Sequence, residues 1–173
     1  QPDATFAALY RVGNGTTGNV GAEVIAHLVV RNGSLEGISL RPRNEVHADV
    51  ARLGPRQSPL WGAPFAIKDN IDMAGLPTTA ACPDFAYAPA EDAFCVARLR
   101  AAGAIAIGKT NLDQFATGLV GLRTPYPPPK NAFDPAVAPG GSSSGSAVAV
   151  ARDLVSFALG TDTAGSGRVP AAF

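Results

Sequence analysis

The residue types best suited to chemistry lie in three short stretches of the sequence. Lys68 follows an apolar run at 64–67, and two loops rich in glycine and serine follow at 140–146 and 160–168. An isolated lysine is usually a solvated charge, and a glycine/serine run is usually a flexible connection. Two such loops separated by a short apolar segment indicate instead a folded site built from backbone amides and hydroxyls.

These residue types favour nucleophilic catalysis by a serine. Burial would lower the pKa of Lys68 from its ordinary value of about 10.4, so that its neutral amine can act as a general base near pH 7. The only histidines are His27 and His47, and neither stands in a persuasive position. A Ser–Lys arrangement therefore fits the composition better than Ser–His–Asp. In "TDTAGSG" the small residues let successive N–H groups converge, as an oxyanion hole requires.

Residues 103–110 read GAIAIGKT and match the G-x-x-x-x-G-K-[ST] pattern of nucleotide-binding loops. That pattern needs a flexible loop after a strand. Here Ala-Ile-Ala-Ile itself favours a strand, and a helix is predicted before Gly103. We therefore interpret Lys109 as a surface or loop lysine that follows a buried strand, and we expect no nucleotide cofactor.

Alternating helices and strands must position these stretches. Helices are predicted at 3–12, at 44–53 with Asn44 as N-cap, at 90–103 with a terminal glycine, and at 144–153. Strands are predicted within 62–75 and at 104–108 and 154–160. The segment 22–30 fits a helix or a strand, and five prolines from Pro125 to Pro135 exclude regular structure there. This alternation favours a layered α/β fold.

Composition excludes several classes of protein. The 173 residues are 46% hydrophobic and 16% charged, which indicates a soluble globular protein with a core. Fourteen basic residues balance fourteen acidic ones, so we expect neither nucleic acid nor a membrane surface as partner. No apolar run reaches the roughly 18–20 residues that span a bilayer. We interpret Cys82 and Cys95 as ordinary core or loop residues in a reducing, cytoplasmic compartment, and we expect no metal site.

The stretches "KDN", "GKTN", "GGSSSGS" and "LGTDTAGSGRVPAAF" occur in this order and together resemble the amidase signature family. The resemblance runs from about Pro59 to Phe173, two thirds of the chain. Within the family, "DMAGLPTTAACPDFAY" and "KTNLDQFATGLVG" are most similar to allophanate hydrolases. The resemblance implies a mixed central sheet covered by helices. It makes 59–173 the N-terminal portion of a truncated catalytic domain and leaves 1–58 as a poorly patterned segment.

The resemblance also assigns roles to individual residues. Ser166 matches the nucleophile, Ser142 matches a bridging serine after a cis peptide bond, and Lys68 matches the general base. The oxyanion hole matches the backbone amides of Thr163, Ala164, Gly165 and Ser166. The supporting hydrogen-bond network matches Ser143, Asp162 and Arg168. The family needs no cofactor or metal for this chemistry.

By resemblance, the chain would hydrolyse the C–N bond of allophanate (urea-1-carboxylate) and release ammonia in nitrogen catabolism. A urea carboxylase would supply the substrate, as a separate protein or on a fused chain, and the full-length protein would be a homodimer. A cationic clamp for the substrate carboxylate is expected beyond Phe173, and Arg123 and Arg168 are weaker candidates.

Three alternatives stay open: a general amidase, a glutamine-hydrolysing amidotransferase subunit, and a catalytically inactive fragment. The chain starts without methionine and stops directly after a loop rich in polar groups. We therefore expect it to be a piece of a longer protein.

Overall fold

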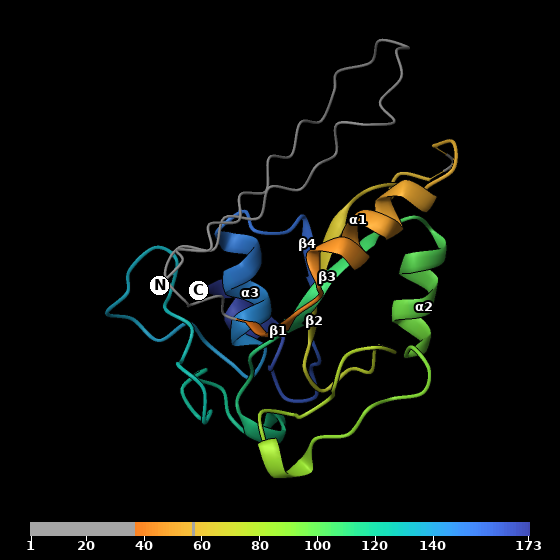
Figure 1. Cartoon of the computed structure of the whole chain (residues 1–173). Helices are drawn as coiled ribbons and strands as arrows, with labels where there is room; N and C mark the ends of the chain where they lie inside the picture. Colours follow the sequence, from red (N-terminus) through yellow and green to blue (C-terminus); the bar gives the residue numbers. More distant parts are fainter. Residues whose placement is uncertain (1–36, 57) are drawn as a thin grey trace, which may run out of the picture.

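The computed structural model describes residues 37–56 and 58–173 (Figure 1). Within them a mixed sheet has the strand order β1-β3-β2-β4, with β2 parallel to both β3 and β4 and β1 antiparallel to β3. The strands are β1 (Gly37–Leu40), β2 (Pro64–Lys68), β3 (Ile105–Thr110) and β4 (Phe157–Leu159). The helices are α1 (Arg43–Arg52), α2 (Phe94–Ala101), α3 (Ser144–Ala151) and α4 (Arg168–Ala172), with 3₁₀ turns η1 (Pro83–Phe85) and η2 (Gln114–Ala116). The predicted α/β class is confirmed.

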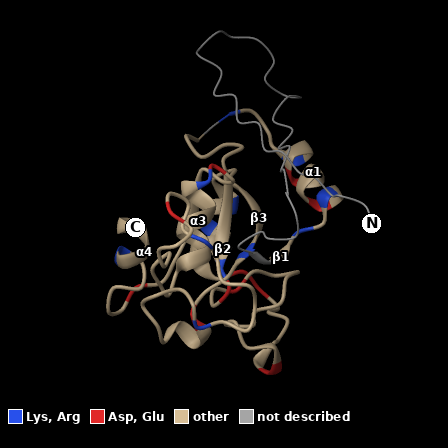
Figure 2. Cartoon of the chain, turned by 90° about the vertical axis from the view of Figure 1, so that its left-hand side faces the viewer, with Lys and Arg blue, Asp and Glu red and all other residues tan. Residues whose placement is uncertain are grey.

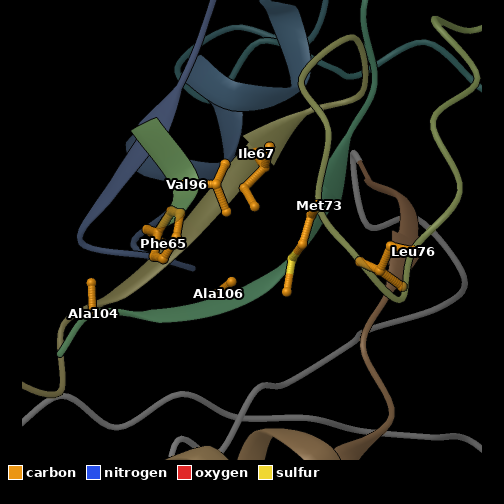
Figure 3. Packing of buried hydrophobic residues seen from close by; sticks show 7 residues of the cluster. All are labelled: Phe65, Ile67, Met73, Leu76, Val96, Ala104 and Ala106. Atoms are coloured by element: carbon orange, nitrogen blue, oxygen red, sulfur yellow. The ribbon is translucent and has the colours of Figure 1, made fainter. Parts of the chain in front are cut away.

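Helices cover both faces of the sheet, and each face has its own apolar cluster. Because side chains alternate along a strand, Phe65 and Ile67 point toward α2, where they pack with Val96 (Figure 3). Ala66 points to the opposite face, where its cluster includes Ala149 of α3. Side chains of α1 pack against this second cluster, so α2 lies on one side of the sheet and α1 and α3 lie on the other (Figure 1).

Most predicted elements are present, with shifted boundaries. The helix predicted at 90–103 begins later, at Phe94, and Gly103 follows its end with φ +88°, the conformation that favours glycine at this position. The proline-rich segment 125–135 has no regular structure, as predicted. The predicted cap Asn44 is wrong, because α1 starts at Arg43 after Pro42 and has no side-chain cap. The predictions at 3–12 and 22–30 lie outside the described residues.

The interpretation of Lys109 as a surface or loop lysine is wrong. Lys109 lies within β3 and is 1% exposed. Its Nζ lies 3.1 Å from Asp69 Oδ1 and donates a hydrogen bond of 3.0 Å to Thr78 Oγ1. The elements around it argue against a nucleotide-binding loop, because α2 precedes Gly103 and the following residues form a buried strand. Across 37–56 and 58–173, helices are too short or too polar to cross a bilayer.

Candidate active site

The candidate site lies at the edge of the sheet where parallel strands end. Lys68 is the last residue of β2. The neighbouring strand β4 ends at Leu159, which pairs with Ile67. The loop that leaves β4 therefore starts beside Lys68. The carboxyl ends of strands in an open α/β sheet are the usual place for a ligand site. The loop before α3 brings Ser142 to the same edge.

Lys68 and Ser142 are in direct contact, as the family resemblance implies. Lys68 Nζ donates a hydrogen bond of 2.7 Å to Ser142 Oγ, and both residues are 0% exposed. The peptide bond between Gly141 and Ser142 is cis, as the family resemblance implies. Gly140 has φ +76°, and a Cβ there would lie 2.8 Å from the backbone of Pro170 in α4. Only a glycine lets the loop pass this close to α4.

Burial prepares Lys68 to lose its proton. Desolvation outweighs the opposing charges of Asp113 and Asp162, and the pKa of Lys68 is lowered from 10.5 to about 8. The other hydrogen-bond partner of Nζ is a neutral hydroxyl, Thr161 Oγ1 at 2.7 Å. The predicted lowering of the pKa is therefore confirmed. A substantial fraction of Lys68 is a neutral amine at mildly alkaline pH.

Ser166 lies in the second loop, close to the first one. It is 7% exposed, and its carbonyl oxygen accepts a hydrogen bond of 3.0 Å from the N–H of Ser143. Ser143 Oγ also donates to the carbonyl oxygen of Thr161 at 3.2 Å. These two bonds tie Ser143 to the second loop, one at the candidate nucleophile itself and one at Thr161. Within 37–56 and 58–173, the Ser166 hydroxyl makes no hydrogen bond, so it is free to meet a substrate or Ser142.

Asp162 shapes the second loop. Its carboxylate accepts two hydrogen bonds from the Arg168 guanidinium, both 2.9 Å, and further bonds from backbone N–H groups, including Gly165 at 2.7 Å. The Arg168 side chain, followed by its backbone N–H and that of Gly165, holds the pKa of Asp162 well below its usual range. Arg168 is therefore committed to an internal ion pair and does not extend freely toward a substrate carboxylate.

The backbone amides predicted for the oxyanion hole divide into two groups. The Gly165 N–H is taken by Asp162, which corrects its predicted place in the hole. In the described part of the chain, the N–H groups of Thr163, Ala164 and Ser166 donate no hydrogen bond. These three remain available to a developing oxyanion.

Two further residues at this site were missed from the sequence. Thr161 accepts hydrogen bonds from Lys68 Nζ and, at 3.1 Å, from Asn70 Nδ2. Asp113 is 0% exposed, and its N–H donates to the carbonyl oxygen of Ser142 at 3.1 Å. Thr161 had a usable signal, because it directly follows a predicted strand and so lies at the same sheet edge as Lys68. No sequence signal pointed to Asp113, because its hydrogen-bond partners lie in a loop without a regular pattern.

Around the site, Asp162 and Asp69 form ion pairs, whereas Lys68 has hydroxyl partners. Basic and acidic residues are both scattered over the described chain (Figure 2). The described residues contain no cluster of three or more histidine, cysteine, aspartate or glutamate side chains that would hold a metal ion. Both cysteines are free thiols. Cys95 is exposed on α2, however, rather than in the core or a loop as predicted.

Comparison with known proteins places this geometry in a family. The Amidase family profile matches residues 39–173. The urea amidolyase of Saccharomyces cerevisiae is 67% identical over 114 residues, which cover 66% of this chain and 6% of that protein. A glutamyl-tRNA(Gln) amidotransferase subunit of Thermus thermophilus is 52% identical over 116 residues, 66% of this chain and 25% of that protein. The chain thus spans a quarter or less of the length of these relatives.

Solved structures agree with this placement. Selenomethionine-substituted allophanate hydrolase of Kluyveromyces lactis has a TM-score of 0.74 and 55% identity, covering 78% of this chain and 23% of that chain. The urea amidolyase of the same organism has a TM-score of 0.75 and 55% identity, with coverages of 78% and 8%. Native peptide amidase from Stenotrophomonas maltophilia has a TM-score of 0.71 and 39% identity, with coverages of 80% and 30%. The chain therefore belongs to the amidase signature family.

Proposed function

We propose that this chain carries the serine machinery of an amide hydrolase, with Ser166 as nucleophile, Ser142 as proton bridge and Lys68 as general base. One observation carries the proposal: a fully buried lysine, with its pKa lowered to about 8, is bonded at 2.7 Å to a serine hydroxyl. A buried lysine that only stabilised the fold would be expected to pair with a carboxylate. The partners of Lys68 are hydroxyls, which suit proton transfer.

The proposed reaction is an acyl transfer in two halves. Neutral Lys68 takes the proton of Ser142, which takes the proton of Ser166 as its Oγ attacks the amide carbonyl carbon. The free N–H groups of Thr163, Ala164 and Ser166 stabilise the oxyanion. The C–N bond then breaks, and the proton returns from Lys68 through Ser142 to the leaving nitrogen. Water attacks the acyl-enzyme through the same relay and restores the Ser166 hydroxyl.

Allophanate is the proposed substrate, and ammonia is the proposed product. The names of two similar proteins support this choice, since one is a urea amidolyase at 67% identity and the other an allophanate hydrolase at 55% identity. We further propose that a urea carboxylase supplies the allophanate and that the full-length protein is a homodimer. We also propose a cytoplasmic location, which the two free thiols support.

A glutamine-hydrolysing amidotransferase subunit is the second candidate, because the Thermus thermophilus amidotransferase protein is 52% identical over 116 residues. A panel of allophanate, malonamide, glutamine and simple aliphatic amides separates the two functions. Allophanate should be hydrolysed fastest. Glutamine as the best substrate would overturn the proposed specificity without affecting the proposed serine mechanism.

The proposed nucleophile is tested by labelling with a fluorophosphonate, followed by intact-mass spectrometry and peptide mapping. The test uses the 173-residue chain and a chimaera in which the K. lactis allophanate hydrolase supplies the sequence after Phe173. We expect one adduct, on Ser166, which is lost in Lys68→Ala and retained in Cys95→Ala as a surface control. Labelling of the chimaera alone would make this chain an inactive fragment. An absence of adduct from both proteins would refute the Ser166 mechanism.

A further inference from the structure

Asp113 is a buried residue whose hydrogen bonds hold together two loops beside the site. Its side chain is 0% exposed and accepts hydrogen bonds from the N–H of Gly121 at 2.9 Å and from the N–H of Arg123 at 2.7 Å. Its own N–H donates to the carbonyl oxygen of Ser142. The N–H of Gly141 in turn donates to the carbonyl oxygen of Leu119 at 2.9 Å. Asp113 therefore joins the segment 119–123 to the Gly141–Ser142 peptide.

Two glycines leave space for this carboxylate, and a third leaves space for the first serine loop. A Cβ on Gly118 would lie 2.5 Å from Asp113 Oδ2, and a Cβ on Gly141 would overlap the same atom. A Cβ on Gly121 would lie 2.5 Å from the carbonyl oxygen of Gly140. Any larger residue at these positions would push the carboxylate or the first serine loop out of place. The Asp113 carboxylate and the first serine loop are therefore closely packed against each other.

Asp113 also differs in charge balance from the other acids near Lys68. Asp162 is ion-paired with Arg168, and Asp69 lies against Lys109 on the other face of the sheet. Asp113 has no ion-pair partner within residues 37–56 and 58–173, and its charge raises the pKa of Lys68 against the effect of burial. Its negative charge therefore acts on Lys68 without neutralisation by a nearby cation.

We propose that Asp113 is a positioning residue for this site, which seats Ser142 against Lys68 and supplies an uncompensated negative charge to the lysine. The inference rests on the proposed function, in which Ser142 carries the proton between Ser166 and Lys68. Geometry and charge act together here. The same side chain that fixes the bridging serine also sets how readily its proton acceptor becomes neutral.

Asp113→Asn tests the proposal, with Asp92→Asn as matched control. Asp92 likewise accepts a backbone N–H, from Ala74 at 2.9 Å, but it lies next to α2, where it is ion-paired with Arg100. The titration of Lys68 is followed by NMR of ¹³Cε-labelled lysine. The labelling rate of Ser166 is measured from about pH 6 to about pH 10, on both sides of the Lys68 pKa of about 8. Circular dichroism reports thermal unfolding for every variant.

In Asp113→Asn we expect the Lys68 midpoint to move below about 8 and the plateau labelling rate to fall about tenfold. Asp92→Asn should leave both unchanged. An unmoved Lys68 midpoint, or a plateau that falls only with the folded fraction, would overturn the proposal. If the wild-type chain and chimaera are not labelled, the proposed function fails, while the NMR titration still decides whether Asp113 acts on Lys68.

Gly118→Ala provides a second variant if Asp113→Asn does not fold. It keeps the charge but presses on the carboxylate from 2.5 Å away. The plateau labelling rate should fall while the Lys68 midpoint stays near 8. An unchanged plateau would contradict the positioning role.

Discussion

The protonation state of Lys68 should control the rate at which Ser166 is acylated. Only the neutral amine can accept the proton of Ser142, and desolvation lowers the pKa of Lys68 from 10.5 to about 8. The rate should therefore rise with pH through a midpoint near 8 and then level off. The perturbation that removes this dependence is Lys68→Met, which keeps a chain of similar length but cannot take up a proton.

The size of the effect follows from the two pKa values. At about pH 7.5, roughly a quarter of Lys68 is neutral with a pKa of about 8, against roughly one part in a thousand with the ordinary value. Burial therefore increases the population of active base by about 200-fold, equivalent to about 3 kcal/mol. Without this lowering, the proposed relay would be almost fully protonated at neutral pH.

The assay measures the second-order rate constant of fluorophosphonate labelling from about pH 6 to about pH 11, by intact mass, in whichever of the chain or the chimaera is labelled. A separate measurement of reagent hydrolysis corrects each point. Lys68→Met should show no pH-dependent limb and a much lower rate. A midpoint near 10.5, or a limb that persists in Lys68→Met, would refute the assignment of Lys68 as the base.

The same shift predicts a pH-dependent stability. Between pH values of about 8 and 10.5, Lys68 is protonated in the unfolded chain and neutral in the folded chain. The unfolded state then binds more protons, so the free energy of unfolding should rise with pH across this window, by about 3 kcal/mol in total. The difference in urea-unfolding curves between wild type and Lys68→Met isolates this contribution. A flat difference would contradict the lowered pKa.

Three substitutions test the structural support of the site. Gly141→Ala should destabilise the fold by about 1–3 kcal/mol in urea unfolding, because its Cβ would overlap Asp113 Oδ2; an unchanged midpoint would contradict this close fit. Lys109→Met should cost about 3–5 kcal/mol by leaving Asp69 unpaired, and adding Asp69→Asn should recover part of the loss; additive losses would argue against the ion pair. Arg168→Lys should slow labelling severalfold without changing the melting temperature, and an unchanged rate would make this exposed ion pair irrelevant to the second loop.

The sequence could predict the parts of this fold that depend on local chemistry. The apolar run before Lys68 forms a fully buried strand, and the glycine after α2 has the positive φ that ends helices. The three functional stretches were identifiable because their small residues and hydroxyls have no role in an ordinary core. The contact between Lys68 and Ser142, 74 positions apart, followed from the family resemblance and not from spacing.

The sequence could not predict the partners of two buried charged residues, Lys109 and Asp113. Lys109 follows apolar residues as Lys68 does, and nothing in its neighbours marks Asp69 as its partner. The sequence gives no sign of the partners of Asp113 either, because its hydrogen-bond donors are backbone N–H groups of a loop that has no periodic pattern. The Lys109–Asp69 pair requires the pairing of β2 with β3, which propensity alone does not determine.

A one-residue irregularity in β3 separates the two buried lysines by function. Phe65 pairs with Ala106, but Ala66 pairs with Gly108, so Ile107 is an extra residue in the ladder. Because paired residues point to the same face, the extra residue turns Lys109 to the α2 side, with Ile67, and away from Lys68. On that side, Lys109 forms an ion pair with the Asp69 carboxylate, which stabilises the structure. On the α3 side, the partners of Lys68 among the described residues are hydroxyls. In a regular ladder, Lys109 and Lys68 would lie on the same face of the sheet. Repulsion between their two ammonium groups would then disfavour the protonated form of Lys68, which the charge of Asp113 favours.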